Sequence, residues 1–174
     1  MKIAVLGYSG AGKSTLARML GEHYNIPVLH LDTVQFLPNW KIRNEDEKRK
    51  MVNDFMQNES WVIDGNYSSL YKKERLAQAD KIIILNFNRF FCFKSALKRY
   101  FENKGTSRMD MADGCNEKFD FEFAMWILFW GRTFRRRKGY KDIYKKYKSK
   151  TLILKKREHV NLYIKSLNNS DIVQ

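Results

Sequence analysis

A glycine-rich segment near the start of the chain has residue types and spacing that could bind phosphate. The stretch from Gly7 to Thr15, GYSGAGKST, matches the pattern G-x-x-x-x-G-K-[ST], the phosphate-binding P-loop, at every position. Glycines let the backbone curl so that successive N–H groups point at phosphate oxygens. Lys13 would bridge the β- and γ-phosphates of ATP, and the Ser14 hydroxyl would ligate Mg²⁺. The predicted nucleotide contacts are Gly7, Ser9, Gly10, Ala11, Gly12, Lys13, Ser14 and Thr15.

The residues on either side of this segment supply the setting that a P-loop requires. Residues 3–6 are an apolar run typical of a strand buried on both faces. Leu16 and Leu20 have helical spacing, so a helix that begins near Lys13 would add its N-terminal partial positive charge. Thr15 would contact the α-phosphate or cap this helix. The alternative is a glycine-rich turn that matches by chance, and the strand–loop–helix order argues against it.

Further along, short apolar runs alternate with segments of helical periodicity, which indicates βαβ units and a mostly parallel sheet. The fold class is therefore α/β, and 174 residues suit a single domain over 1–174. Pro27 begins the second run and cannot donate a sheet hydrogen bond, which places that strand at an edge. The expected strands are residues 3–6, 28–31, 61–63, 82–85 and 152–154.

Helices are expected between and after these strands. One begins at Asn44 with Glu47 as a capping-box partner, another follows the fourth strand to about Phe101, and the last ends near Asn168. Residues 104–137 have no strand signal and predict a loop and a helix inserted over the sheet. The expected inward-facing residues are Met51, Val52, Phe55 and Met56 in the first of these helices, and Val160, Ile164 and Leu167 in the last.

Composition excludes several classes of protein. Hydrophobic residues make up 44% of the chain and charged residues 30%, which excludes a disordered or collagen-like chain. The longest apolar run, residues 123–130, is less than half of a membrane span. Cys92 and Cys115 lie in no metal-ligand pattern, so we expect a reduced, cytoplasmic protein. None of the three histidines, His23, His30 and His159, has a ligand partner in the sequence pattern, and structural roles are expected for His23 and His30.

The formal net charge of +14 is concentrated in one segment. Residues 132–157 contain 13 basic residues and one acid, Asp142, interleaved with aromatic residues. Such a segment is most often a solvated face, but the aromatic residues favour a functional surface. Charge alone does not choose among nucleic acid, nucleotide phosphates and an anionic membrane. Residues 119–134 carry an apolar stripe at helical spacing, which would either lie on a membrane or pack on the core; we expect the core.

Three further segments resemble a known family. They are HLDTVQFLPNW at 30–40, WVIDGNYS at 61–68 and RMDMADGC at 108–115. Together they resemble the bacterial DNA-topology modulation proteins (FlaR-like), a family similar to adenylate kinase and other small nucleoside and nucleotide kinases. The resemblance implies a P-loop NTPase three-layer fold with a five-stranded parallel sheet in order 2-3-1-4-5 and helices on both faces. It also implies a helical lid, about 104–137, between the fourth and fifth strands.

The resemblance also suggests residues for the acceptor side. Asp32 follows the second strand, where similar kinases place an acid that holds Mg²⁺ through water or takes the acceptor's hydroxyl proton. Capping of the next turn is the alternative role. Asp64 and Gly65 correspond to the Asp-Gly of the adenylate kinase segment, so Asp64 would be a Mg²⁺ or substrate ligand, or else a turn former. Gly65 would allow close backbone approach, and Asn66 would contact the acceptor.

The arginine of that adenylate kinase segment is absent, because Tyr67 and Ser68 stand in its place. Arg75 would replace it in substrate binding or would be a solvated helix residue. Trp40 would stack on an acceptor ring or pack under the lid. Arg157 follows the fifth strand, where similar enzymes hold the adenine ring.

Arginines at the predicted lid would stabilise the transferring phosphoryl group. The candidates are Arg99, Arg108, Arg132, Arg135 and Arg136. Arg132 and Arg136 are preferred as catalytic residues, because residues four apart on one helix share a face.

Two functions are therefore expected. The first is an ATP-dependent, Mg²⁺-requiring kinase for a small acceptor, in which Lys13, Asp32, Arg132 and Arg136 are catalytic. The second is a nucleotide-switched DNA-binding protein that affects DNA topology through nonspecific contacts of residues 132–157. We prefer the kinase, and we expect no membrane partner.

Overall fold

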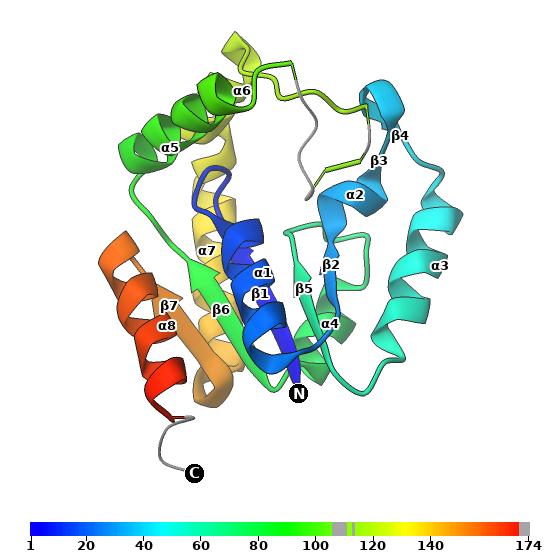
Figure 1. The fold of residues 1–174 in the computed structure, drawn as a ribbon, viewed down its shortest axis with the longest axis vertical. Coiled ribbons are helices and arrows are strands. Elements are labelled where there is room, and N and C mark those ends of the chain that lie inside the picture. The colour runs from blue at the N-terminus through cyan, green and yellow to red at the C-terminus, as the bar shows by residue number, and fades with distance from the viewer. Residues whose placement is uncertain (106–110, 113, 171–174) are drawn as a thin grey trace.

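The computed structural model describes residues 1–105, 111–112 and 114–170 (Figure 1). A five-stranded sheet lies at the centre, with the order β2-β5-β1-β6-β7 and parallel pairing throughout. These are the five expected strands, so the α/β class and the order 2-3-1-4-5 are confirmed. The strands are β2 (Val28–His30), β5 (Trp61–Asp64), β1 (Lys2–Gly7), β6 (Lys81–Leu85) and β7 (Thr151–Leu154).

The central strands are apolar between their end residues because helices cover both faces of the sheet. Ile3 and Val5 of β1 belong to one core, whereas Ala4 and Leu6 belong to the other. This division follows from the alternation of side chains along a strand. β2 lies at the edge, as Pro27 predicted, and the Pro27 carbonyl accepts a hydrogen bond from the next strand.

The first core lies under α1 (Lys13–Tyr24) and α8 (Arg157–Ser170), which contribute Leu16, Leu20 and Val160. Ile164 and Leu167 pack partly buried against the same core, as expected. The final helix extends to Ser170, beyond the predicted end near Asn168.

The second core lies under three helices: α3 (Glu45–Met56), α4 (Lys72–Gln78) and α7 (Phe134–Lys146). Asn44 caps α3, as predicted, by accepting a hydrogen bond from Asp46 N–H at 2.8 Å. Glu47 lies instead beside Arg43, 4.0 Å away, so the predicted capping box is absent among the described contacts.

One inward-facing residue of α3 was predicted wrongly. Met51 is 41% exposed, and Lys48 is buried in its place alongside Val52 and Met56. Residues 48, 52 and 56 are spaced by four, so they share one helical face, which Met51 does not occupy. Lys48 can be buried because its ammonium donates to the Glu45 carboxylate at 2.6 Å.

The region after the fourth strand contains α5 (Arg89–Glu102) and α6 (Phe121–Leu128), which lie over the carboxyl edge of the sheet (Figure 1). The predicted single helix over residues 119–134 is wrong. A 3₁₀ turn, η2 (Trp130–Arg132), and an extended Thr133 separate α6 from α7. The apolar stripe packs partly on the first core through Phe123 and Ile127, as expected. Within the described part of the chain, no helix combines the length and apolarity needed to cross a membrane.

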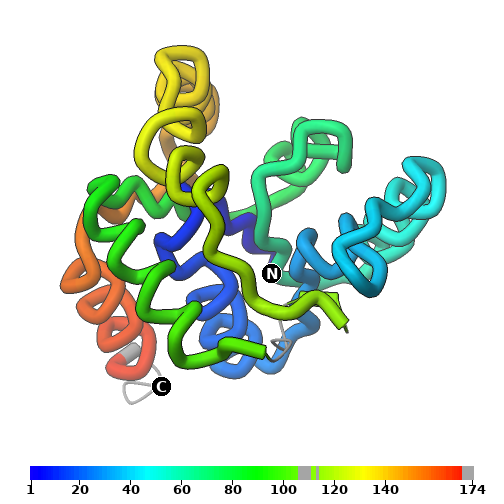
Figure 2. The backbone as a smooth tube through the Cα atoms, turned by 90° about the horizontal axis from the view of Figure 1, so that it is seen from above, coloured from blue at the N-terminus to red at the C-terminus, as the bar shows by residue number. Residues whose placement is uncertain are grey.

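A short helix, α2 (Leu31–Gln35), follows β2 and leads into a hairpin. The hairpin consists of β3 (Phe36–Leu37), the 3₁₀ turn η1 (Pro38–Trp40) and β4 (Lys41–Ile42). A further 3₁₀ turn, η3 (Lys148–Lys150), precedes β7. The segment just before α6 crosses to this hairpin (Figure 2), where Trp40 Nε1 donates to the Asn116 carbonyl and the Cys115 thiol donates to the Leu37 carbonyl. Cys92 and Cys115 are both free and buried.

Gly21 sets the distance between α1 and β2. A Cβ added there would lie 2.2 Å from Val28 Cγ2 and 3.1 Å from the Ile26 carbonyl oxygen. We expect Gly21→Ala to lower the free energy of unfolding by about 1–2 kcal/mol, because the overlap outweighs the helix propensity of alanine. Adding Val28→Ala removes the main overlap, so in that background Gly21→Ala should be neutral or stabilising in urea unfolding. A constant effect in both backgrounds would contradict this packing.

Candidate active site

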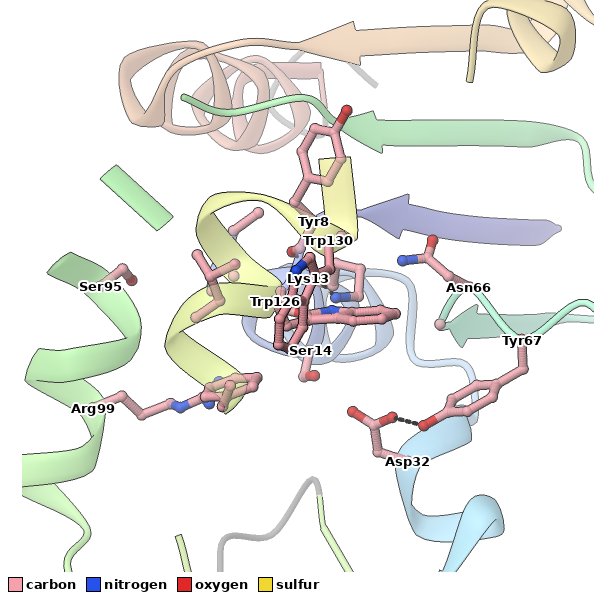
Figure 3. A pocket seen from close by; sticks show the side chains of 18 of the residues that line it. Tyr8, Lys13, Ser14, Asp32, Asn66, Tyr67, Ser95, Arg99, Trp126 and Trp130 are labelled. Atoms are coloured by element: carbon pink, nitrogen blue, oxygen red, sulfur yellow. Dashed lines mark hydrogen bonds between the residues drawn. The ribbon is translucent and has the colours of Figure 1, made fainter. Parts of the chain in front are cut away.

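A cavity of about 1390 Å³ opens at the carboxyl edge of the sheet. Residues 8–15 of the P-loop line one side of it, and the loop after β5 and the α2–β4 segment line another. Figure 3 shows Lys13 and Ser14 in this cavity with Asp32 and Tyr67 across from them. The topology explains this grouping, because the carboxyl ends of parallel strands meet at one edge.

The P-loop has the backbone conformation that phosphate binding requires. Gly10 and Gly12 have φ values of +77° and +86°, which favour glycine. A Cβ on Gly10 would lie 2.3 Å from the Cys92 carbonyl oxygen of α5, so the loop packs closely on that helix. Lys13 begins α1, and its ammonium donates to the Tyr8 carbonyl at 3.3 Å. Ser9, Ala11, Ser14 and Thr15 line the cavity beside it, where the sequence placed them.

Asn66 holds the start of the P-loop. Its Nδ2 donates to the Gly7 carbonyl at 2.6 Å, and its Oδ1 accepts from Gly7 N–H at 3.3 Å. Tyr140 of α7 also donates to Oδ1, at 3.3 Å. Burial raises the pKa of the Tyr140 hydroxyl, so it remains protonated as a donor. Asn66 also lines the cavity, so its contact with an acceptor stays a prediction.

Arg132 lies beneath the P-loop rather than in the cavity. Its guanidinium stacks 3.8 Å from the centre of the Tyr8 ring and donates to the carbonyls of Phe87 and Ile127. Arg132 lies in η2 and Arg136 in α7, so the prediction that they share a helical face is wrong. The physical reason is the extended Thr133, which breaks the helix between them. Arg132 is thus in a position to fix the P-loop, not to reach a phosphoryl group.

The other predicted lid arginines differ in position. Arg136 is exposed, lines the cavity and stacks 4.4 Å from the centre of the Trp126 ring. Arg135 lines the cavity as well. Arg99 also faces it, and its guanidinium is held by the buried Glu117 carboxylate at 2.7 Å. Arg108 lies outside the described residues, as does half of the 108–115 segment.

The acceptor side presents one carboxylate paired with a phenol. Tyr67 donates its hydroxyl proton to Asp32 Oδ1 at 2.7 Å (Figure 3). Burial and the neighbouring Asp32 carboxylate raise the pKa of Tyr67, so the phenol stays a donor. Trp40 lines the cavity but also packs under the crossing segment, which was the alternative role predicted for it. Asp32 therefore faces the cavity with one oxygen already held.

Asp64 does not line the cavity. It is 3% exposed, and its Oδ1 lies 2.9 Å from His30 Nδ1. The predicted contacts of Asp64 with Mg²⁺ or substrate are absent from this arrangement, because its carboxylate faces His30 of the neighbouring strand β2. Gly65 follows with φ +131° and packs against Leu31, where a Cβ would be 2.8 Å from that side chain. The His30 partner was not predicted from the sequence.

Arg75 is fully buried, so both roles predicted for it are wrong. Its guanidinium donates to the carbonyls of Leu70, Gly65 and Tyr67 and so supports the loop that carries Tyr67. Burial lowers its pKa to about 10, which still leaves it charged at neutral pH. A residue with no exposed surface cannot contact a substrate.

At the far side of the P-loop, Arg157 lines the cavity as the first residue of α8. Its Nη1 lies 3.2 Å from the Cβ position of Gly12, so the guanidinium reaches the loop. Lys72, Trp126 and Trp130 also line the cavity, and no role in the site was predicted for them from the sequence. The only feature of the sequence that could have placed Lys72 in the site is its position in the loop-to-helix segment after Asp64. The two tryptophans were expected to pack on the core.

Comparisons with known proteins agree with a kinase-type P-loop. An adenylate kinase of Listeria monocytogenes is 36% identical over 80 residues, which cover 46% of this chain and 35% of that protein. An adenylate kinase of Bartonella tribocorum is 34% identical over 107 residues, or 60% of this chain and 54% of that protein. The chain thus spans about a third to a half of the length of these relatives. No protein-family model matches the chain.

Solved structures with the same fold cover nearly the whole chain. Shikimate kinase from Bacteroides thetaiotaomicron is 18% identical with a TM-score of 0.54, over 97% of both chains. An uncharacterized protein from Eubacterium ventriosum is 17% identical with a TM-score of 0.50, over 97% of this chain and 98% of that chain. The sequence matches support a P-loop kinase, and the structural matches support the fold. Neither kind of match supports DNA binding or the topology-modulation family.

The buried Arg75 allows a direct test of how the loop after β5 is held. We expect Arg75→Met to lower the free energy of unfolding by about 2–4 kcal/mol, because three main-chain carbonyls lose their donor. The matched control is Lys73→Met, an exposed position on the same helix, which should change stability by less than about 0.5 kcal/mol. Equal urea midpoints for Arg75→Met and Lys73→Met would refute the bracing role.

Proposed function

We propose that this protein is a phosphotransferase of the nucleoside and nucleotide kinase type, which transfers the γ-phosphate of Mg-ATP to a small acceptor. The observation that carries the proposal is a single cavity with a P-loop on one side and the Asp32–Tyr67 pair on the other. A donor nucleotide and an acceptor could occupy such a cavity together. Proximity of two bound reactants is a major part of catalysis in this class.

The P-loop would hold the donor. Its backbone N–H groups and the N-terminus of α1 would bind the phosphate oxygens, and Lys13 would leave the Tyr8 carbonyl to contact the β- and γ-phosphates. Arg157 would contact the nucleotide from the start of α8. The Ser14 hydroxyl would hold Mg²⁺, which neutralises charge on the phosphates. The donor set fits this ion only in part, because Asp64 faces His30 instead of the cavity.

Asp32 would orient the acceptor and take its proton. The hydroxyl of Tyr67 holds one carboxylate oxygen, so the carboxylate is fixed toward the cavity. Arg136 would close on the transferring group together with the proposed lid, about 104–137, and exclude water. The specificity of adenylate kinase is not part of the proposal, since Tyr67 and Ser68 replace the arginine of its segment.

The first test is ADP formation from Mg-ATP with nucleosides, nucleoside monophosphates and small hydroxylated metabolites as acceptors. We expect acceptor-dependent ADP from one of these classes. Lys13→Ala should abolish it, because the β- and γ-phosphates lose their cation, while the circular dichroism spectrum stays unchanged. Acceptor-dependent turnover that survives in folded Lys13→Ala protein would overturn the proposed role of the P-loop.

The second test concerns Asp32. Asp32→Asn keeps the size of the side chain but removes the base, so turnover with the active acceptor should fall by about 10²- to 10⁴-fold. Binding of a non-hydrolysable ATP analogue should stay within about twofold of wild type, because Asp32 is across the cavity from the P-loop. Tyr67→Phe, which removes only the hydrogen bond to Asp32, is the control and should reduce turnover less. Full activity in Asp32→Asn would exclude Asp32 as the base.

A further inference from the structure

Two of the cationic side chains that line the cavity lie near each other and have no acidic partner among the described residues. Lys72, at the start of α4, and Arg136, on α7, both line the cavity. Among the residues that the structure describes, neither lies within ion-pair distance of a carboxylate. Arg136 contacts the Trp126 ring, which leaves its charge uncompensated. These two cations therefore face the same space without a counter-charge.

Lys72 is in an environment that is unfavourable for a charge. The side chain is half-buried, and burial lowers its pKa, with further lowering by the neighbouring cations Arg75 and Arg136. No acid contributes to this shift. Desolvation of an ammonium beside two other cations costs free energy that an anion in the cavity would recover.

Several other buried or half-buried cations among the described residues have hydrogen-bonded partners, whereas no ion pair of Lys72 is found there. Lys48 is paired with Glu45 at 2.6 Å, and Arg99 with Glu117 at 2.7 Å. Arg75 donates to three carbonyls. Lys72 instead faces the cavity from the end of the loop that carries Tyr67 and Ser68. Its missing partner is thus a group that enters the cavity from outside.

We propose that the acceptor carries an anionic group, phosphate or carboxylate, which binds Lys72 while its hydroxyl group lies at Asp32. This inference rests on the proposed function and narrows the acceptor class. The carboxylate of Asp32 repels an anion but accepts a hydroxyl proton, so the two ends of the acceptor are distinguished by charge. The acceptor is a small hydroxylated anion, and Lys72 is a specificity-determining residue that touches it away from the reacting atoms.

The test separates this site from the P-loop. The protein is first saturated with Mg²⁺ and the β,γ-imido analogue of ATP, which fills the P-loop, and inorganic phosphate is then titrated in. Binding is followed by backbone amide chemical shifts of residues 65–72. We expect Lys72→Met to weaken phosphate binding at least about tenfold, because a charge-assisted contact is lost. Lys73→Met, one residue along the same helix and exposed, should change it less than about twofold.

Two further arms identify the anion and the role. Malonate replaces phosphate in a second titration. A loss of affinity for either anion in Lys72→Met supports the proposal, and the anion that wild-type protein binds more tightly identifies the preferred group. With the active acceptor, Lys72→Met should raise KM much more than it lowers kcat, since the contact is distant from the reacting hydroxyl. Binding of the ATP analogue should not change in this variant.

Three outcomes would overturn the inference. Phosphate and malonate binding that is the same in Lys72→Met and wild type excludes the site, although the kinase proposal would stand if the analogue binds. Equal weakening by Lys72→Met and Lys73→Met shows general charge screening instead of a site. If the analogue does not bind wild-type protein, the proposed function fails and this inference fails with it.

Discussion

The position of the P-loop depends on two hydrogen bonds from one side-chain amide. Main-chain pairing between β5 and β1 ends where Gly65 N–H donates to the Val5 carbonyl. One residue further on, the amide of Asn66 bonds both the N–H and the carbonyl of Gly7 and so takes the place of a peptide group. Without it, Gly7 would leave the sheet with unpaired polar groups at the mouth of the cavity. Residues 8–15, which line the phosphate side of the cavity, come directly after Gly7 in the chain, so their position depends on how Gly7 is held.

Two buried arginines extend the same support to the surrounding loops. Arg75 organises the loop that carries Tyr67, and Arg132 joins the P-loop to the chain between α6 and α7. Both bond main-chain carbonyls, and neither is paired with a carboxylate. A guanidinium suits this role because its several fixed donors can satisfy carbonyls from different segments at once. The walls of the cavity are therefore held by cations that never enter it.

Local patterns in the sequence were enough to predict the P-loop, the five strands and the edge position of β2. Each depends on a short stretch, such as the match at Lys13 or the Pro27 that opens β2. The roles of Arg75 and Arg132 could not be predicted, because their partners are main-chain carbonyls. An arginine bonds such carbonyls instead of water only when the fold buries it, and a local sequence pattern does not show whether it is buried. The helix break before α7 contains a glycine, Gly131, where a Cβ would lie 2.7 Å from the Trp126 carbonyl oxygen. The apolar periodicity continues through this glycine, so periodicity alone predicted an unbroken helix.

The close approach of Gly10 to the Cys92 carbonyl has a mechanical consequence. The first turns of α5, with Cys92 and Ala96 fully buried, pack directly against the P-loop. The loop and the start of this helix therefore cannot shift independently, because a smaller separation would create an overlap at Gly10. A substitution that displaces α5 would thus also change the shape of the phosphate side of the cavity.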